Sequence, residues 1–257
     1  MLTVQQLVSI MPVIPAARRE AFLPFLQAAM TEFAIESPAR AAAFLAQLAH
    51  ESGQFRFMEE IWGPTAAQRR YEPASTLATN LGNSEVGDGR RFKGRGPIQI
   101  TGRANYRRFG DLLGADLVSE PARAALPEIA FRIAGLYWAK KGLNELADRA
   151  TDDAFREITR RINGGFNGLE DRRKFYAVAR TVLGVVQPPI ARDANVPGAD
   201  DEPAFERGNE AIRRHLRRIR TKRKKPVARR AKSGSRRTTK TSRPKKLQGK
   251  NSKKKKR

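Results

Sequence analysis

The chain has 257 residues, no cysteine and two histidines, and its formal net charge at pH 7 is +25. This length allows one domain of ordinary size with a buried core, plus a smaller segment. The lack of cysteine excludes disulfides, thiolate zinc sites and a cysteine nucleophile, and two histidines exclude a multi-histidine metal centre. No apolar run approaches the ~20 residues that a membrane-spanning helix needs.

The positive charge is concentrated at one end of the chain. Residues 211–257 contain 24 Lys and Arg and no Asp or Glu, whereas residues 1–210 contain 27 Lys and Arg against 26 Asp and Glu. The sequence therefore predicts a nearly neutral globular body followed by a cationic tail. This distribution excludes a single, uniformly basic nucleic-acid-binding domain.

The first part of the body is predicted to be helical. Thr3 with Gln6 has the pattern of a capping box that opens a short helix. Ser37 followed by Pro38 predicts the N-cap and first residue of a later helix, which Gly53 ends. The predicted helices cover about 4–10, 16–33 and 38–52.

The middle of the body differs in composition and in periodicity. Residues 54–102 are dense in glycine and proline and show no sustained helical period, so we expect loops and short extended pieces there. Helices resume further along, each between clear start and stop signals. They are expected over about 127–141, 152–163 and 169–183, the last with Phe175, Val178, Ala179 and Val182 facing inward.

The composition changes again after residue 186. Residues 187–203 are rich in Pro, Asp and Ala, which is typical of a linker. Residues 204–225 are compatible with a basic amphipathic helix, and the remainder has too few apolar side chains to fold alone, so it is expected to be disordered. We therefore predict a globular domain over 1–186, a linker over 187–203 and a basic tail over 204–257.

Glu51 is the first candidate for chemistry. It lies near the end of the helix predicted over 38–52, seven residues after Phe44 and three after Leu48, and so shares the apolar face. Partial desolvation raises the pKa of a carboxyl group there, which suits it to donate a proton near neutral pH. The alternative is a glutamate that simply reaches solvent from a helix end.

Glu60 is the candidate partner of Glu51. Nine residues separate the two, and Gly53 between them permits a bend that brings both carboxyls to one cleft. Glycoside hydrolysis uses such a pair, in which one group protonates the leaving oxygen and the other activates water or attacks. Glu59 competes for the second role, and adjacent side chains should point to different sides. The alternative is that both are surface residues.

The glycine-rich segment 94–102 is a second candidate region. If 97–101 is extended, Gln99 and Thr101 face the same way, and their amide and hydroxyl line one surface. Such a surface would bind a sugar N-acetyl group or fix a water. Thr101 is alternatively the cap of a helix that starts near Arg103. The segment lacks the Gly-Lys-[Ser/Thr] ending of a phosphate-binding loop.

These segments together resemble glycoside hydrolase family 19, the chitinase family that also includes bacterial and phage cell-wall lysins. The similarity covers about 16–185, and the short connections resemble the bacterial and phage branch more than the plant branch. The matching motifs are His50-Glu51-Ser52-Gly53, Glu60, Gly94-Arg95-Gly96-Pro97-Ile98-Gln99-Ile100-Thr101, Asn105-Tyr106 and Arg161-Ile162-Asn163-Gly164-Gly165.

The resemblance implies a fold and a reaction. The implied fold is mainly α-helical and lysozyme-like, with two lobes and a substrate cleft. The implied reaction is hydrolysis, with inversion, of β-1,4 linkages next to N-acetylglucosamine, without metal or cofactor. Chitin and bacterial peptidoglycan both present this linkage, so both are candidate substrates, and peptidoglycan is the one we expect.

The resemblance also implies roles for individual residues. Glu51 matches the general acid, Glu60 the general base, and Thr101 the residue that holds the attacking water. Arg172 matches an arginine that interacts with the catalytic carboxylates, with Arg173 as the alternative. The residues expected to bind substrate are His50, Gln99, Asn105, Tyr106, Asn163 and Arg172, with Trp62 and Tyr71 as candidate sugar-stacking aromatics; His50, Trp62 and Tyr71 are alternatively packing residues.

The tail and the N-terminus predict where the protein acts. We expect a monomer made without a signal peptide in a bacterial cytoplasm, then released through a separate pore to the cell wall or periplasm. Residues 204–257 are expected to bind an anionic cell-envelope surface, with non-specific nucleic-acid binding or a solvated extension as alternatives. A non-catalytic polyanion-binding protein with a degenerate hydrolase body is the alternative function.

Overall fold

The structure is a computed structural model, and it describes residues 1–186. The predicted linker 187–203 and the predicted tail 204–257, with its expected helix over 204–225, lie outside the described residues. Helices dominate the described part, in which the β-structure consists of two isolated antiparallel bridges. The elements are α1 (Val4–Ile10), α2 (Ala16–Glu32), α3 (Pro38–Glu51), α4 (Ala66–Arg69), α5 (Thr76–Leu81), α6 (Asp88–Arg91), α7 (Arg103–Leu113), the 3-10 helix η1 (Pro121–Ala125), α8 (Pro127–Lys140), α9 (Leu143–Asp148), α10 (Asp152–Asn163) and α11 (Leu169–Leu183).

Side-chain caps set three of the six helix starts that the sequence predicts. Thr3 and Gln6 form the expected capping box on α1, and the Ser37 and Thr151 hydroxyls accept backbone N–H groups at the starts of α3 and α10. Each cap satisfies an N–H group that a helix end leaves unpaired. The mainly α fold class is therefore confirmed for the described residues.

One local expectation is incomplete and another is wrong. Residues 54–102 are mostly loop with two isolated bridges, as expected, but they also contain the short helices α4, α5 and α6, which were not predicted; Thr65 and Ser75 cap the first two. On α11, Val178 is exposed rather than inward, and Tyr176 is buried instead, stacked on Phe155 with ring centroids 4.0 Å apart. The buried stripe of this helix is thus turned toward the face that carries Tyr176.

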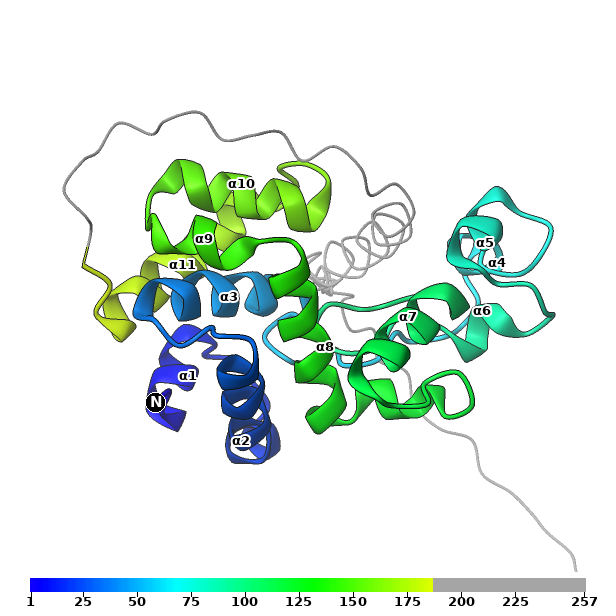
Figure 1. The fold of residues 1–257 in the computed structure, drawn as a ribbon, viewed down its shortest axis with the longest axis horizontal. Coiled ribbons are helices and arrows are strands. Elements are labelled where there is room, and N and C mark those ends of the chain that lie inside the picture. The colour runs from blue at the N-terminus through cyan, green and yellow to red at the C-terminus, as the bar shows by residue number, and fades with distance from the viewer. Residues whose placement is uncertain (187–257) are drawn as a thin grey trace, which may run out of the picture.

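The helices form two groups joined by α8 (Figure 1). The larger group has α3 packed along α11, with α1, α2, α9 and α10 around this pair, whereas α4, α5, α6 and α7 form the smaller group. This arrangement agrees with the predicted lysozyme-like, two-lobed fold. No helix of residues 1–186 is both long enough and apolar enough to cross a bilayer.

The apolar core is divided unequally between the two groups. One large cluster runs from α1 through α11 and also takes in the apolar side chains of the segment 92–109. A small separate cluster of Tyr71, Leu77 and Leu81, with Trp62 against it, lies in the smaller group. The smaller lobe therefore depends more on polar contacts, which the site described next supplies.

Candidate active site

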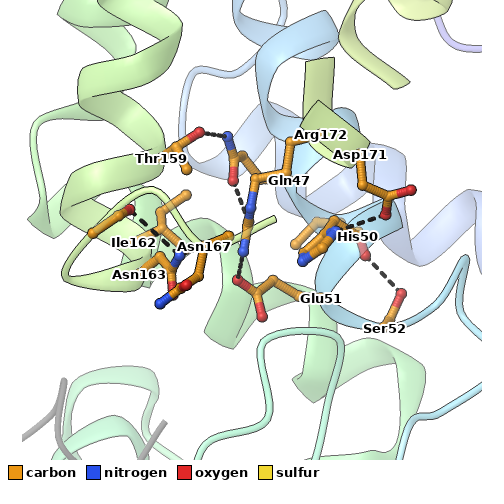
Figure 2. Close-up of polar contacts among 12 residues, drawn as sticks. Gln47, His50, Glu51, Ser52, Thr159, Ile162, Asn163, Asn167, Asp171 and Arg172 are labelled. Carbon is orange, nitrogen blue, oxygen red and sulfur yellow. Dashed lines mark hydrogen bonds and ion pairs between the residues drawn. The ribbon is translucent and has the colours of Figure 1, made fainter. Parts of the chain in front are cut away.

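Glu51 is held by a buried arginine at the junction of two helices. It is the last residue of α3, and its Oε1 accepts a hydrogen bond from Nη2 of Arg172 on α11 at 2.6 Å (Figure 2). The Arg172 side chain is fully buried and that of Glu51 is 9% exposed. Arg173, the alternative, is a surface residue that pairs with Asp152 and Glu170. The geometry thus places Arg172, and not Arg173, at the carboxylate.

A second layer of polar side chains fixes Arg172. Gln47 lies one helical turn before Glu51, and its Oε1 accepts a hydrogen bond from Nη1 of Arg172. The Gln47 amide donates in turn to the Thr159 hydroxyl at 3.0 Å, and that hydroxyl donates to the Phe155 carbonyl at 3.0 Å. Gln47 and Thr159 are both buried, so this chain of hydrogen bonds fixes the Arg172 guanidinium through Nη1, while Nη2 contacts Glu51.

The charge environment of Glu51 includes the arginine that the family resemblance implies, a contribution that burial alone leaves out. The Arg172 guanidinium stabilises the ionised carboxylate and so acts against the desolvation that burial imposes. The Gln47–Arg172 contact was missed because periodicity shows only that Gln47 shares the face of Glu51. A glutamine within the apolar run Ala41–Ala49 is nevertheless a signal, since a buried amide requires partners.

His50 is a packed residue in the described structure. Its Nδ1 lies 2.8 Å from Oδ2 of Asp171 (Figure 2). Gly168 lies so close to the imidazole that an added Cβ would be 2.4 Å from its Cε1, and the positive φ of 74° at Gly168 also favours glycine. Asn163 anchors the same loop by donating to the Asn167 carbonyl at 2.7 Å. These contacts favour the packing alternative for His50, and Asn163 stabilises the loop that packs on it; substrate binding by either residue stays a prediction.

Glu60 lies in a different kind of environment. The residue is 4% exposed, and its carboxylate accepts hydrogen bonds from the Gln68 amide and from the Gly94 N–H, each at 3.0 Å. Its own N–H donates to the Gly94 carbonyl at 2.8 Å. Neutral donors therefore hold this carboxylate, whereas a cation holds Glu51.

Glu59 points away from Glu60, as adjacent residues should. Its side chain is 45% exposed and pairs with Arg95 Nε at 3.0 Å and with Lys93 Nζ at 3.2 Å. Arg95 is buried and reaches on to the Tyr106 hydroxyl at 2.8 Å. Glu59 thus belongs to a peripheral ion-pair network, and Glu60 is the better placed of the two for the second carboxylate.

The segment around Gln99 is a tight turn and not the extended strand that was expected. Arg95 pairs with Ile100, and the chain reverses between them because Gly96 and Gln99 both have positive φ. The Gln99 amide donates to the Gly96 carbonyl at 2.7 Å, and the Thr101 hydroxyl donates to the Gln99 carbonyl at 3.1 Å. Both side chains are buried and brace the turn.

The helix after this turn starts without the expected threonine cap. Its N-cap is Gly102, so the alternative role of Thr101 as a cap is wrong. Asn105, in the first turn of α7, is half-buried and donates to the Thr101 carbonyl at 2.8 Å. Asn105 therefore joins α7 to the turn that carries Gln99 and Thr101.

Two aromatic candidates are core residues. Tyr106 is fully buried, and its hydroxyl donates to the Lys93 carbonyl at 2.6 Å. Tyr71 is 1% exposed, and its pKa is raised by burial and also by the nearby Glu60 carboxylate. Because both rings are buried, neither has an open face for a sugar. The polarity pattern of the sequence does not reveal this burial. Trp62 is half-buried, 6.3 Å from the Tyr71 ring between centroids.

Gln68 and Arg95 are site residues that the sequence analysis missed. Both are buried and polar, and each contacts one glutamate of the Glu59–Glu60 pair. The Thr65-x-x-Gln68 spacing is a capping-box signature and could have identified a helix start at this point. The additional contact of Gln68 with Glu60 required the folded geometry.

Comparison with known proteins gives one consistent family. The family model described as chitinase class I, glycosyl hydrolase family 19, matches residues 20–154. A Haemophilus influenzae glycosyl hydrolase family 19 domain-containing protein is 38% identical over 158 residues, which cover 52% of this chain and 76% of that protein. An Arabidopsis thaliana endochitinase is 40% identical over 126 residues, 48% of this chain and 39% of the endochitinase.

Solved structures agree on the fold. Chitinase C from Streptomyces griseus HUT6037 superposes with a TM-score of 0.56 at 23% identity, covering 73% of this chain and 78% of the chitinase. A second bacterial family 19 chitinase superposes with a TM-score of 0.55 at 23% identity, covering 73% of this chain and 97% of that one. The arrangement of helices in Figure 1 is therefore shared with both.

Proposed function

Because this chain belongs to glycoside hydrolase family 19, we propose that it hydrolyses β-1,4 linkages next to N-acetylglucosamine in a cell-wall polymer. The observation that carries the proposal is the pair of glutamates with contrasting surroundings. Glu51 lies against the Arg172 guanidinium, and Glu60 accepts two neutral hydrogen bonds. Acid and base roles require two carboxyl groups with different surroundings; the role of Glu51 as the acid comes from the family resemblance, since the Arg172 contact favours the ionised carboxylate that remains after proton transfer.

Glu51 is the general acid in this proposal. It gives its proton to the glycosidic oxygen as the bond to the anomeric carbon breaks, and the carboxylate that remains is stabilised by Arg172 at 2.6 Å. The Gln47 and Thr159 hydrogen bonds keep the guanidinium in place during this change of charge. Arg172 is therefore needed most after the proton has left.

Glu60 is the general base. It takes a proton from a water molecule whose oxygen attacks the anomeric carbon from the opposite face, which inverts the configuration. The Thr101 hydroxyl donates its own proton to Gln99, so toward such a water its oxygen acts as an acceptor. The products are two shorter sugar chains, and the proton on Glu60 returns to Glu51 through solvent.

The test compares glutamate variants on two substrates. Glu51→Gln and Glu60→Gln should each lower hydrolysis of N-acetylglucosamine oligomers and of purified peptidoglycan by roughly a hundredfold or more. Glu59→Gln, the matched control, should stay within about threefold of wild type, since the Glu59 side chain is 45% exposed and glutamine keeps an oxygen that accepts the Arg95 hydrogen bond. Equal rates for Glu51→Gln and wild type on both substrates would refute the proposal.

Peptidoglycan is the substrate that we propose for a lysin of bacterial or phage origin. Mass spectrometry of the products from walls and from chitin oligomers distinguishes the two polymers, and NMR of the first products reports whether the new anomeric centre is inverted. Faster cleavage of chitin than of walls would contradict the assignment to peptidoglycan.

The cationic tail supports a second part of the proposal, that the enzyme is held on an anionic envelope surface. Residues 211–257 carry 24 basic and no acidic side chains, so their binding to polyanions should weaken steeply with salt. Deleting residues 204–257 should reduce binding to whole cells while leaving hydrolysis of a soluble oligomer nearly unchanged. Loss of oligomer hydrolysis on deletion would contradict the separation of body and tail, and tighter binding to nucleic acid than to walls would favour the alternative partner.

A further inference from the structure

Gln68 connects the start of a short helix to the second glutamate of the site. It is the third residue of α4 and is completely buried. Its backbone N–H is capped by the Thr65 hydroxyl at 3.2 Å, as in any capping box. Its side chain, however, also reaches Glu60, eight residues earlier in the chain.

The hydrogen bonds of the Gln68 amide allow only one orientation. The amide oxygen accepts the N–H groups of Thr65 at 2.8 Å and Gly63 at 3.4 Å. The amide nitrogen donates to Glu60 Oε1 at 3.0 Å and to the Ile61 carbonyl at 2.9 Å. An amide has two donor hydrogens and two acceptor lone pairs, so all four are used. A flipped amide would place its oxygen against the carboxylate, and the donor must therefore face Glu60.

The Glu60 carboxylate is held at both oxygens as a result. Gln68 contacts Oε1 and the Gly94 N–H contacts Oε2, each at 3.0 Å. Glu60 itself is 4% exposed, and the buried Tyr71 lies close by. In such a poorly solvated place each hydrogen bond to the carboxylate is stronger than it would be in water, and the two together fix the direction of the carboxylate.

We propose that Gln68 is a positioning residue that orients the Glu60 carboxylate for its role as the base. This inference rests on the proposed function, in which Glu60 accepts a proton from water. Gln68 does not touch the reacting atoms; it acts through Glu60. Because its amide oxygen is fixed by the N–H groups at the start of α4, the fold of this short helix sets the direction of the base.

Two variants and one control test the inference. Gln68→Met keeps the length of the side chain but removes every hydrogen bond, and Gln68→Glu keeps an acceptor for Thr65 and Gly63 but turns the donor into an oxygen. Ser75→Ala is the matched control, because it removes the equivalent hydroxyl cap from the neighbouring α5 without contact to Glu60. Circular dichroism reports the folded fraction of each variant at the assay temperature.

The expected result separates positioning from stability. Gln68→Met should lower kcat by about tenfold or more with little change in KM, and should shift the acidic limb of the kcat/KM profile upward by about half a pH unit or more. Gln68→Glu should shift that limb further, because two carboxyl groups share one site. Ser75→Ala should keep the wild-type profile.

Either Gln68 variant decides the question if the other fails to fold. The inference is overturned if the folded variants have the kcat and acidic limb of Ser75→Ala. A Glu60→Gln variant measured in parallel identifies which proposal has failed. If Glu60→Gln is inactive while the Gln68 variants behave like the control, only the positioning role is wrong. If Glu60→Gln is fully active, the assignment of Glu60 as the base is wrong.

Discussion

The two sides of the candidate site hold their carboxylates by different physical means. On the side of the larger lobe, the last residue of α3, Glu51, is fixed by the buried Arg172 of α11, and the packing of these two helices holds the pair together. On the side of the smaller lobe, Glu60 is fixed by neutral donors from a short helix and a turn. The first arrangement depends on charge balance and the second on local backbone geometry. Substitutions on the two sides should therefore destabilise the protein for different physical reasons.

The largest expected effect concerns the charge balance at Glu51. Arg172→Met should lower the free energy of unfolding by about 3–5 kcal/mol, because it leaves a carboxylate and the Gln47 amide without their buried partner. Urea denaturation at neutral pH measures this loss. The double variant Arg172→Met with Glu51→Gln should recover part of it, since the unpaired charge is then absent. No recovery in the double variant would show that packing, and not charge, dominates on this side.

A somewhat smaller effect is expected from the loop that packs on His50. Gly168→Ala should cost about 2–3 kcal/mol, because the added Cβ would lie 2.4 Å from the imidazole and φ is +74°. Gly165→Ala is the matched control in the same loop, since an added Cβ there meets no atom within 4 Å. Thermal denaturation of the pair provides the comparison. Equal stability of the two variants would mean that the loop can shift away from His50 at little cost in free energy.

The smallest of the three effects concerns the lobe that carries Glu60. Asp88 is buried and its carboxylate accepts two hydrogen bonds from Arg103, at 2.8 and 2.6 Å. Burial alone would raise the pKa of Asp88, but the Arg103 hydrogen bonds and those from the N–H groups of Glu85 and Ser84 outweigh it and lower the pKa below its ordinary value. A lowered pKa stabilises the fold above the unfolded pKa, and this stability disappears as the pH falls through the folded value.

Asp88→Asn should therefore cost about 1–2 kcal/mol at pH 7 and progressively less below about pH 4. Unfolding measured from pH 7 to pH 2 checks the convergence of the variant with wild type. A constant difference across this range would contradict a charge-based role for Asp88. Convergence of the two unfolding free energies at low pH would support a charge-based role for Asp88.

The sequence predicts those parts of the fold that short-range signals control. Caps at Thr3, Ser37 and Thr151 fix helix starts because the hydroxyl and the N–H group that it binds are three residues apart. The positions of Glu51 and Arg172 were also predicted, through the family resemblance. Burial of Tyr71 and Tyr106 was not, because it depends on which distant segments cover each ring. The turn at Gln99 was missed for a related reason, since a non-glycine residue with positive φ is uncommon.

The ion pair between Glu51 and Arg172 spans 121 positions of the chain, as does the contact between His50 and Asp171. During synthesis Glu51 therefore emerges long before the arginine that completes its surroundings. The segment that matches the family model ends at residue 154, before α11 begins. A nascent chain of that length would contain both glutamates and still lack Arg172, so the surroundings of Glu51 are complete only once α11 has packed against α3.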